Sequence, residues 1–343
     1  MEDYAKINQL LDDYQSNILK ISPSESATTL AHIYSLIVEY NDSPEKGAIL
    51  VRMASVYIVI ANYRKALQIA DEALYIFTKL NDKLQLALCY GLIGNVCSTM
   101  GEFDKALNAF NKMVEYGLQL NNMQIIANGL SNIGTINSYR GNYDLALESY
   151  QRALDLFVKY DDPHSVSVTY NNIGSALQHK GDYATAKNYY EKSLKSLGQD
   201  GEDKFVGAIL HNIGQLYAFT KEYGKSFEYL YRSIQVKKIV HDLSGLANTY
   251  GVLATIHFDL NEFEKAMQDL QESMAIQEQI GDKYGLFQNT KLLIALVDKL
   301  QDNVLMVKYL EYAIQLATEL GIDDERRSLS DRRNKLVHFG HGA

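Results

Sequence analysis

The sequence predicts an all-α protein, a solenoid of stacked helix-turn-helix hairpins. Three observations predict this fold class: an internal repeat of 40 residues, apolar residues spaced three and four apart in both halves of the repeat, and turn-forming residues where the helices should end. The repeat is most visible at one aromatic position, which is occupied by Tyr63, Phe103, Tyr143, Tyr183, Tyr223 and Phe263. Six copies at a constant spacing, without one insertion, indicate a repeat architecture rather than chance.

The third copy shows how one unit is built. Leu130, Ile133 and Gly134 share one face of its expected first helix, and Tyr143 and Ala146 share one face of its second. Equivalent small residues recur in the first six copies, whereas Ile294 and Met306 replace them in a weaker seventh copy. We expect the small residues to let the paired helices approach closely, while the aromatic ring of Tyr143 fills the gap beside them.

Residues that tolerate a left-handed backbone stand where the helices should stop. The first helix of a unit is expected to end at Gly101, Gly141, Gly181 and Asn261 in four copies. The second helix is expected to end at Asn81, Asn121, Asp161, Gly201, His241, Gly281 and Gly321. The three prolines, Pro23, Pro44 and Pro163, fall at expected helix starts, where a missing N–H costs little.

The repeat divides the chain into three parts. Residues 1–46 are expected to form a degenerate N-terminal hairpin that acts as a cap. Seven units follow, at residues 47–86, 87–126, 127–166, 167–206, 207–246, 247–286 and 287–326. Residues 327–343 are expected to complete a polar C-terminal helix that begins near residue 323, and the last five residues are expected to be disordered.

Composition and charge exclude several classes of protein. The 343 residues carry a net charge of −9, so no nucleic acid is expected as a partner. Several stretches of 16 to 19 residues lack charge, but each contains several amide, hydroxyl or imidazole side chains, so no membrane insertion is expected. The polar N-terminus is unlike a secretory signal, and Cys89 and Cys97 are too far apart on one helix for a disulfide. We therefore expect a cytoplasmic protein with reduced thiols.

The repeated motif resembles a known family. A large residue, two spacers, Ile or Leu followed by Gly, and then Ala twelve positions later is similar to the tetratricopeptide repeat, and the 40-residue unit resembles the longer-helix variety of kinesin light chains and Rap-type peptide receptors. The resemblance covers residues 47–326. It implies a right-handed superhelix in which the first helix of each unit lines a concave groove. It also implies that Asn132, Asn172 and Asn212, which precede the Ile-Gly pairs, match asparagines that grip a ligand backbone.

The candidate binding site is the face of these first helices that points away from the packed core. The chain has 33 basic and 42 acidic residues, yet the first helices of units 2 to 6 have almost none. The candidate peptide-binding residues on this face are Asn95, Asn128, Asn132, Asn171, Asn172, Gln178, His179, His211, Asn212, Gln215 and Asn248. A carboxamide offers both a donor and an acceptor, which suits the N–H and C=O groups of a peptide backbone. The alternative is an ordinary exposed surface, although the exposed faces of the second helices use Glu and Lys instead.

These patterns predict a noncatalytic scaffold that holds an extended or helical segment of a protein or peptide in a neutral, Asn-rich groove. The alternative is an N-terminal sensor or regulatory module of a bacterial-type signalling protein, such as a kinase, a cyclase or a Rap-like peptide receptor, whose output domain lies outside this chain. The sequence has no catalytic, cofactor or metal-ligand motif, so it is not expected to be an enzyme or to need a cofactor or metal. Self-association through the terminal repeats is a further expectation for its partners.

Overall fold

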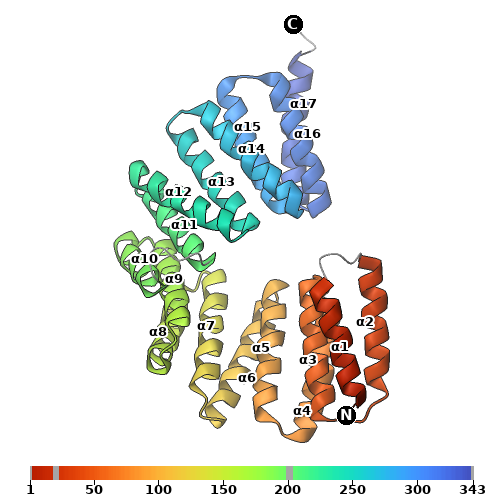
Figure 1. Ribbon diagram of the computed structural model, residues 1–343. Helices are drawn as coiled ribbons and strands as arrows, with labels where there is room; N and C mark the ends of the chain where they lie inside the picture. The colour runs from red at the N-terminus through yellow and green to blue at the C-terminus, as the bar shows by residue number, and fades with distance from the viewer. Residues whose placement is uncertain (1, 18–22, 198–203, 341–343) are drawn as a thin grey trace. The chain divides into compact units, whose positions relative to one another are not determined.

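The repeated hairpins are present throughout the chain. The computed structural model describes residues 2–17, 23–197 and 204–340, and these residues form seventeen helices and no strand (Figure 1). The all-α fold predicted from the repeat is therefore confirmed. The helices are α1 (Glu2–Asn17), α2 (Pro23–Val38), α3 (Pro44–Val59), α4 (Tyr63–Leu80), α5 (Lys83–Thr99), α6 (Phe103–Gln119), α7 (Met123–Tyr139), α8 (Tyr143–Tyr160), α9 (Pro163–His179), α10 (Tyr183–Leu197), α11 (Lys204–Phe219), α12 (Tyr223–Ile239), α13 (Leu243–Asp259), α14 (Phe263–Ile280), α15 (Lys283–Leu300), α16 (Asn303–Leu320) and α17 (Asp323–Gly340).

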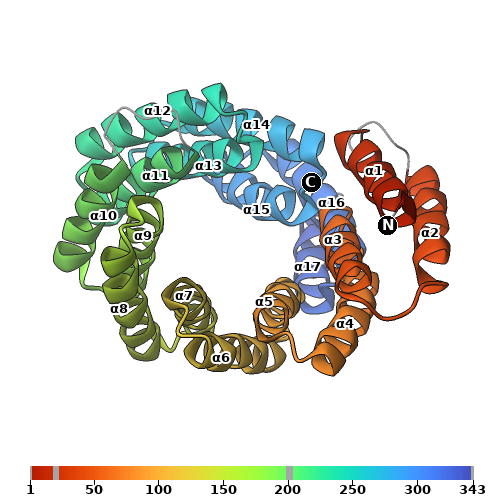
Figure 2. The ribbon, with the colours of Figure 1, turned by 60° about the horizontal axis from the view of Figure 1, so that its bottom comes forward.

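The chain divides into two compact units, residues 1–180 and 181–343. In the first unit, α3, α5, α7 and α9 contact one another in turn and form one layer, while α4, α6 and α8 form the other layer (Figure 2). In the second unit, α11, α13 and α15 form the corresponding layer against α12, α14 and α16. We call the first helix of each hairpin an A helix and the second a B helix.

The A helices begin three or four residues before the unit boundaries expected from the sequence. The boundary at residue 87, for example, falls inside α5, which begins at Lys83. A capping residue sets this start: the Oδ1 of Asp82 accepts the backbone N–H of Gln85 at 3.1 Å. Asn122 and Asp162 cap α7 and α9 in the same way.

Residues with a left-handed backbone conformation follow the helix ends, as expected. Positive φ angles occur at Gly101, Gly141, Gly181, Asn261, Asn81, Asn121, Asp161, His241, Gly281 and Gly321, whereas Gly201 lies outside the described residues. Ala61, Lys221 and Gln301 adopt the same conformation, with φ of 57°, 61° and 55°. These three side chains do not favour it. The fixed geometry of the hairpin therefore imposes the left-handed turn even where the residue type gives no signal.

Close packing within a hairpin depends on a small residue of the A helix. A Cβ atom added to Gly134 would lie 2.7 Å from Cδ1 of Tyr150 on the paired B helix. Gly94 meets Phe110 in the same way at 2.5 Å. The expectation that Tyr143 fills this gap is wrong, because the ring over the glycine belongs to the residue seven positions later.

The first aromatic residue of α6, α8 and α10 instead joins one hairpin to the next. The Tyr143 ring stacks on His179, at the end of the following A helix, with a centroid distance of 5.6 Å and an interplanar angle of 5°. Phe103 contacts Tyr139 in the equivalent place, with centroids 6.1 Å apart. The same offset of 36 residues relates the ion-paired side chains of Asp104 and Arg140. These ring contacts and this ion pair therefore connect consecutive repeats.

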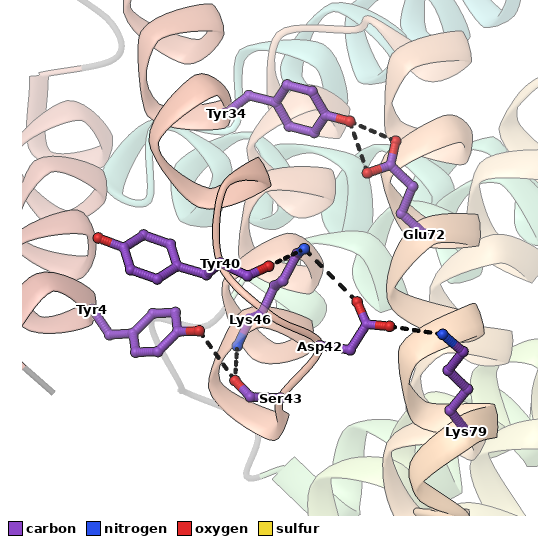
Figure 3. A network of polar contacts seen from close by, with 8 residues as sticks. All are labelled: Tyr4, Tyr34, Tyr40, Asp42, Ser43, Lys46, Glu72 and Lys79. Atoms are coloured by element: carbon purple, nitrogen blue, oxygen red, sulfur yellow. Dashed lines mark hydrogen bonds and ion pairs between the residues drawn. The ribbon is translucent and has the colours of Figure 1, made fainter.

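The N-terminal helices pack as a hairpin that precedes the first repeat. Arg52 on α3 donates to Asn8 Oδ1 and Asp12 Oδ1 of α1, both at 2.6 Å. The Tyr34 hydroxyl on α2 donates to the carboxylate of Glu72 on α4 at 2.8 Å (Figure 3). Thus α1 contacts an A helix and α2 contacts a B helix.

The C-terminal helix is longer than expected. α17 continues through Phe339 and Gly340, which were expected to be disordered, and residues 341–343 lie outside the described part of the chain. No helix-breaking residue occurs between Asp323 and Gly340. An ion pair of 2.7 Å joins Arg332 to Asp298 on α15.

A pair of glycine substitutions tests the packing within a hairpin. We expect Gly134→Ala to destabilise the chain by ~1–3 kcal/mol, because the new methyl group overlaps the buried Tyr150 ring. Gly251→Ala is the matched control. That glycine is also inside an A helix, but its nearest neighbour would be 3.6 Å from the added Cβ. This control should stabilise the helix by ~0.5–1 kcal/mol. Urea unfolding followed by circular dichroism gives both values, and two changes of the same sign would contradict this packing.

Candidate functional site

The structure distributes the predicted site residues over the A helices of both units. The first unit holds Asn95 on α5, Asn128 and Asn132 on α7, and Asn171, Asn172, Gln178 and His179 on α9. The second holds His211, Asn212 and Gln215 on α11, and Asn248 on α13. Because α5, α7 and α9 are neighbours, as are α11 and α13, each unit brings its own subset onto one layer.

The amide side chains differ in exposure. Asn95, Asn128 and Asn248 are exposed, whereas Asn132, Asn171, Asn172, Asn212 and Gln215 are half-buried. Half-buried amides of this kind can still meet a ligand at the helix surface while packing against the neighbouring A helix.

Three predicted residues have structural roles that the sequence did not reveal. Gln178 is only 8% exposed, so it lies toward the packed side of α9 rather than on the open face. Its neighbour His179 is exposed, but one face of its ring is covered by Tyr143. His211 is half-buried, and its Nδ1 lies 3.1 Å from Oγ1 of Thr249 on α13. Adjacent helical positions point about 100° apart, which separates Gln178 from His179.

A buried lysine lies next to His211. Lys237 on α12 is 3% exposed, and its Nζ donates to Gly245 O at 3.0 Å and to Thr249 Oγ1 at 2.8 Å. It forms no ion pair with any residue that the structure describes. Burial lowers the pKa of Lys237 to about 8, although Asp242 opposes the shift. Burial and the nearby ammonium lower the pKa of His211 to about 3, so this imidazole is neutral at physiological pH.

Exposed apolar side chains share the A-helix face with the amides. Leu88, Tyr139 and Phe219 are 44%, 66% and 59% exposed. Leu88 lies 40 residues before Asn128, and Phe219 lies 40 residues after His179, so both occupy site positions of the repeat. The site predicted from the sequence contains only polar side chains and therefore lacks these residues. The period of 40 residues already placed them on this face.

A cavity opens between α11 and α13. Its volume is about 180 Å³, and it is lined by Gln215, Ala218, Phe219, Val252, Thr255, Ile256 and Asp259. The lining is mostly apolar, with Gln215, Thr255 and Asp259 as its polar members. Gln215 is a predicted site residue, so this cavity belongs to the candidate face of the second unit.

Other kinds of site find no support in the described residues. No group of three or more His, Cys, Asp or Glu side chains within residues 2–17, 23–197 and 204–340 is placed to hold a metal ion. Among these residues, no helix combines the length and apolar character needed to cross a bilayer. Cys89 and Cys97 are free and buried, and burial raises the pKa of the Cys89 thiol to about 12.

The pH dependence of unfolding tests the buried lysine. The pKa of Lys237 is about 8 in the folded chain and 10.5 ordinarily, so between these values the folded state binds fewer protons than the unfolded state. Wild-type stability should therefore rise with pH across this window. We expect the free energy of unfolding of the wild type, minus that of Lys237→Met, to increase by ~3 kcal/mol from pH 8 to pH 10.5.

Urea unfolding at a series of pH values measures this difference. Lys238→Met is the matched control, because Lys238 is the next residue and is exposed. Its difference from the wild type should stay nearly constant. If the stability difference between the wild type and Lys237→Met also stayed constant with pH, the lowered pKa of Lys237 would be contradicted.

Comparison with known proteins identifies the repeat. A family model of the tetratricopeptide repeat matches residues 45–116, 125–198 and 205–279, which together make up more than half of the chain. A search of curated proteins finds no match.

Solved structures with a similar fold share little sequence with this chain. The apo form of RapI has a TM-score of 0.65 and 15% identity, covering 81% of this chain and 99% of that chain. The Rap conjugation gene regulator of plasmid pLS20, solved with the Phr* peptide, has a TM-score of 0.63 and 14% identity, covering 94% of this chain and 97% of that chain. A signal transduction ATPase with a tetratricopeptide repeat sensor, from Pyrococcus horikoshii, has a TM-score of 0.63 and 16% identity, covering 94% of this chain but 48% of that chain.

At these identities the solved structures establish the fold alone, and the family model carries the assignment. The matched residues, the 40-residue period and the stacked hairpins together show that the chain belongs to the tetratricopeptide repeat family.

Proposed function

We propose that this chain is a noncatalytic binding protein that holds an extended or helical peptide segment against its A helices. One observation carries the proposal: in each unit the A-helix face combines carboxamides with exposed apolar side chains and has very few charges. Asn128 and Tyr139 on α7 are examples. The amides can pair with a peptide backbone, and the apolar groups can cover its side chains.

The scarcity of charge on this face favours a ligand that is recognised through its peptide backbone. Burying a peptide backbone without hydrogen bonds costs free energy for each unpaired N–H and C=O group. Asn132 and Asn172 lie on the neighbouring helices α7 and α9, 40 residues apart, and can meet successive parts of one segment. In the second unit, Asn212 on α11 occupies the equivalent position of its repeat. A ligand held in this way needs no particular net charge.

A sensor role is the second candidate. It is supported by two fold neighbours, one solved with the Phr* peptide and one that uses its tetratricopeptide repeats as a sensor. In this form of the proposal, peptide binding to the A helices would regulate a partner protein or an output domain.

Peptide selection with matched variants tests the binding face. The full chain is immobilised, a phage-displayed library of random peptides is selected against it, and a selected peptide is synthesised and titrated. The Asn132→Ala, Asn172→Ala and Asn212→Ala triple variant should bind at least about tenfold more weakly, because several buried hydrogen bonds are lost. The ratio of the wild-type affinity to that of the triple variant should change little between low and high ionic strength, because the amides carry no charge.

Exposed amides on B helices provide the control. Asn108 on α6 and Gln271 on α14 are exposed, and alanine at both positions should leave the affinity unchanged. Thermal unfolding of each variant shows whether the fold is preserved. If the control loses affinity and the triple variant retains it, the site lies on the B helices and the proposal fails.

A further inference from the structure

The cavity between α11 and α13 has the chemistry of a side-chain pocket. Its apolar walls come from Ala218, Val252 and Ile256. The Phe219 ring lines it as well and is 59% exposed. The Phe219 ring also stacks on Tyr183, with a centroid distance of 6.3 Å and an interplanar angle of 7°. Because this stack holds the ring in place, a ligand that covers Phe219 loses little side-chain entropy on binding.

A single carboxylate stands at this apolar cavity. Asp259 is exposed, and its Oδ2 accepts a long hydrogen bond of 3.4 Å from the Tyr223 hydroxyl. No lysine, arginine or histidine pairs with Asp259 in the described ranges of the chain. Apart from Lys204 at the start of α11, the other residues on this face of α11 and α13 are uncharged: Ala208, Asn212, Gln215, Phe219, Asn248, Val252 and Thr255. Asp259 is therefore a negative charge without a counter-ion beside an apolar cavity.

The carboxylate is also particular to this repeat. The positions that correspond to Asp259 at intervals of 40 residues are occupied by Val59, Thr99, Tyr139, His179, Phe219 and Lys299. None of them is acidic. The sixth repeat thus differs from its neighbours at the place where the cavity opens.

We propose that this cavity binds an arginine side chain of the peptide ligand, an inference that rests on the proposed peptide-binding function. The aliphatic part of arginine packs against Val252 and Ile256. Its planar guanidinium stacks on the Phe219 ring and pairs with the Asp259 carboxylate. A neutral side chain would cover the apolar walls but leave Asp259 partly desolvated and unpaired. Lysine would supply the charge without the planar stacking surface.

Peptide selection against the wild type and two variants tests whether the negative charge of Asp259 causes a preference for arginine. Peptides selected from a random phage-displayed library against the full wild-type chain should be enriched in arginine. Against Asp259→Asn, peptides should still be selected but without this enrichment, since asparagine keeps an acceptor for Tyr223 and removes the charge. Glu264→Gln on α14 is the matched control. It removes another exposed carboxylate and should keep the arginine enrichment.

A double-mutant cycle then measures the pairing. In a selected peptide, arginine is replaced by citrulline, which has a similar shape and no charge. The replacement should weaken binding to the wild type by about tenfold and binding to Asp259→Asn by much less. Equal losses for both proteins would overturn the arginine pocket.

The outcomes separate this inference from the proposed function. Peptides that depend on Asn132, Asn172 and Asn212 but lack arginine, or that keep an arginine preference against Asp259→Asn, would overturn the pocket alone. An apolar anchor residue that binds both proteins equally would do the same. Failure to select any peptide that depends on the A-helix amides would overturn the proposed function together with the pocket.

Discussion

In several hairpins, the contact between a small residue of the A helix and the large side chain above it on the B helix sets the spacing of the two helices. Gly134 and Tyr150 lie 16 residues apart in sequence, as do Gly94 and Phe110. Where the A-helix residue is Ala54, the corresponding B-helix residue is the small Ala70. In these three hairpins the sizes of the two partners compensate, whereas Ile294 faces Leu310 in the seventh. The A helices of a unit contact one another in turn and form one layer, on which the candidate face depends.

Two seams between hairpins of the second unit use a chemistry that differs from that of two seams in the first. At one position of the repeat, the first unit has the buried rings of Phe77 and Phe157. In the second unit, α12 and α14 have Lys237 and Gln277 at this position, both 3% exposed, and α16 has the buried Ala317. Gln277 Oε1 accepts from Asn289 Nδ2 at 2.9 Å, much as Lys237 donates across its own seam. Directional hydrogen bonds thus replace apolar contact, and they fix the alignment of α12 with α13 and of α14 with α15.

The period made the helices, their order and most left-handed turns predictable, because every copy repeats the same backbone pattern. The partner of a side chain across a helix pair was less predictable. One sequence shows which face of a helix is apolar, but Tyr143 and Tyr150 both lie on that face of α8, and only the position of α7 decides which ring covers Gly134. The carboxylate of Asp259 was missed for a related reason. It is the last residue of α13, where the charge-free pattern ends, and its importance depends on a cavity formed with α11.

The aromatic pairs spaced 36 residues apart have a mechanical consequence. Tyr139 stands on the candidate face, while its ring contacts Phe103 of the preceding hairpin. A ligand resting on Tyr139 would therefore press on a joint between two repeats, and its affinity would depend on how far that joint is bent. By thermodynamic reciprocity, a bound peptide would favour one curvature of the first unit, and any force that bends the unit would change how tightly the peptide is held. The rings of Tyr139 and Phe103 would then contribute both to peptide binding and to the resistance of the first unit to bending.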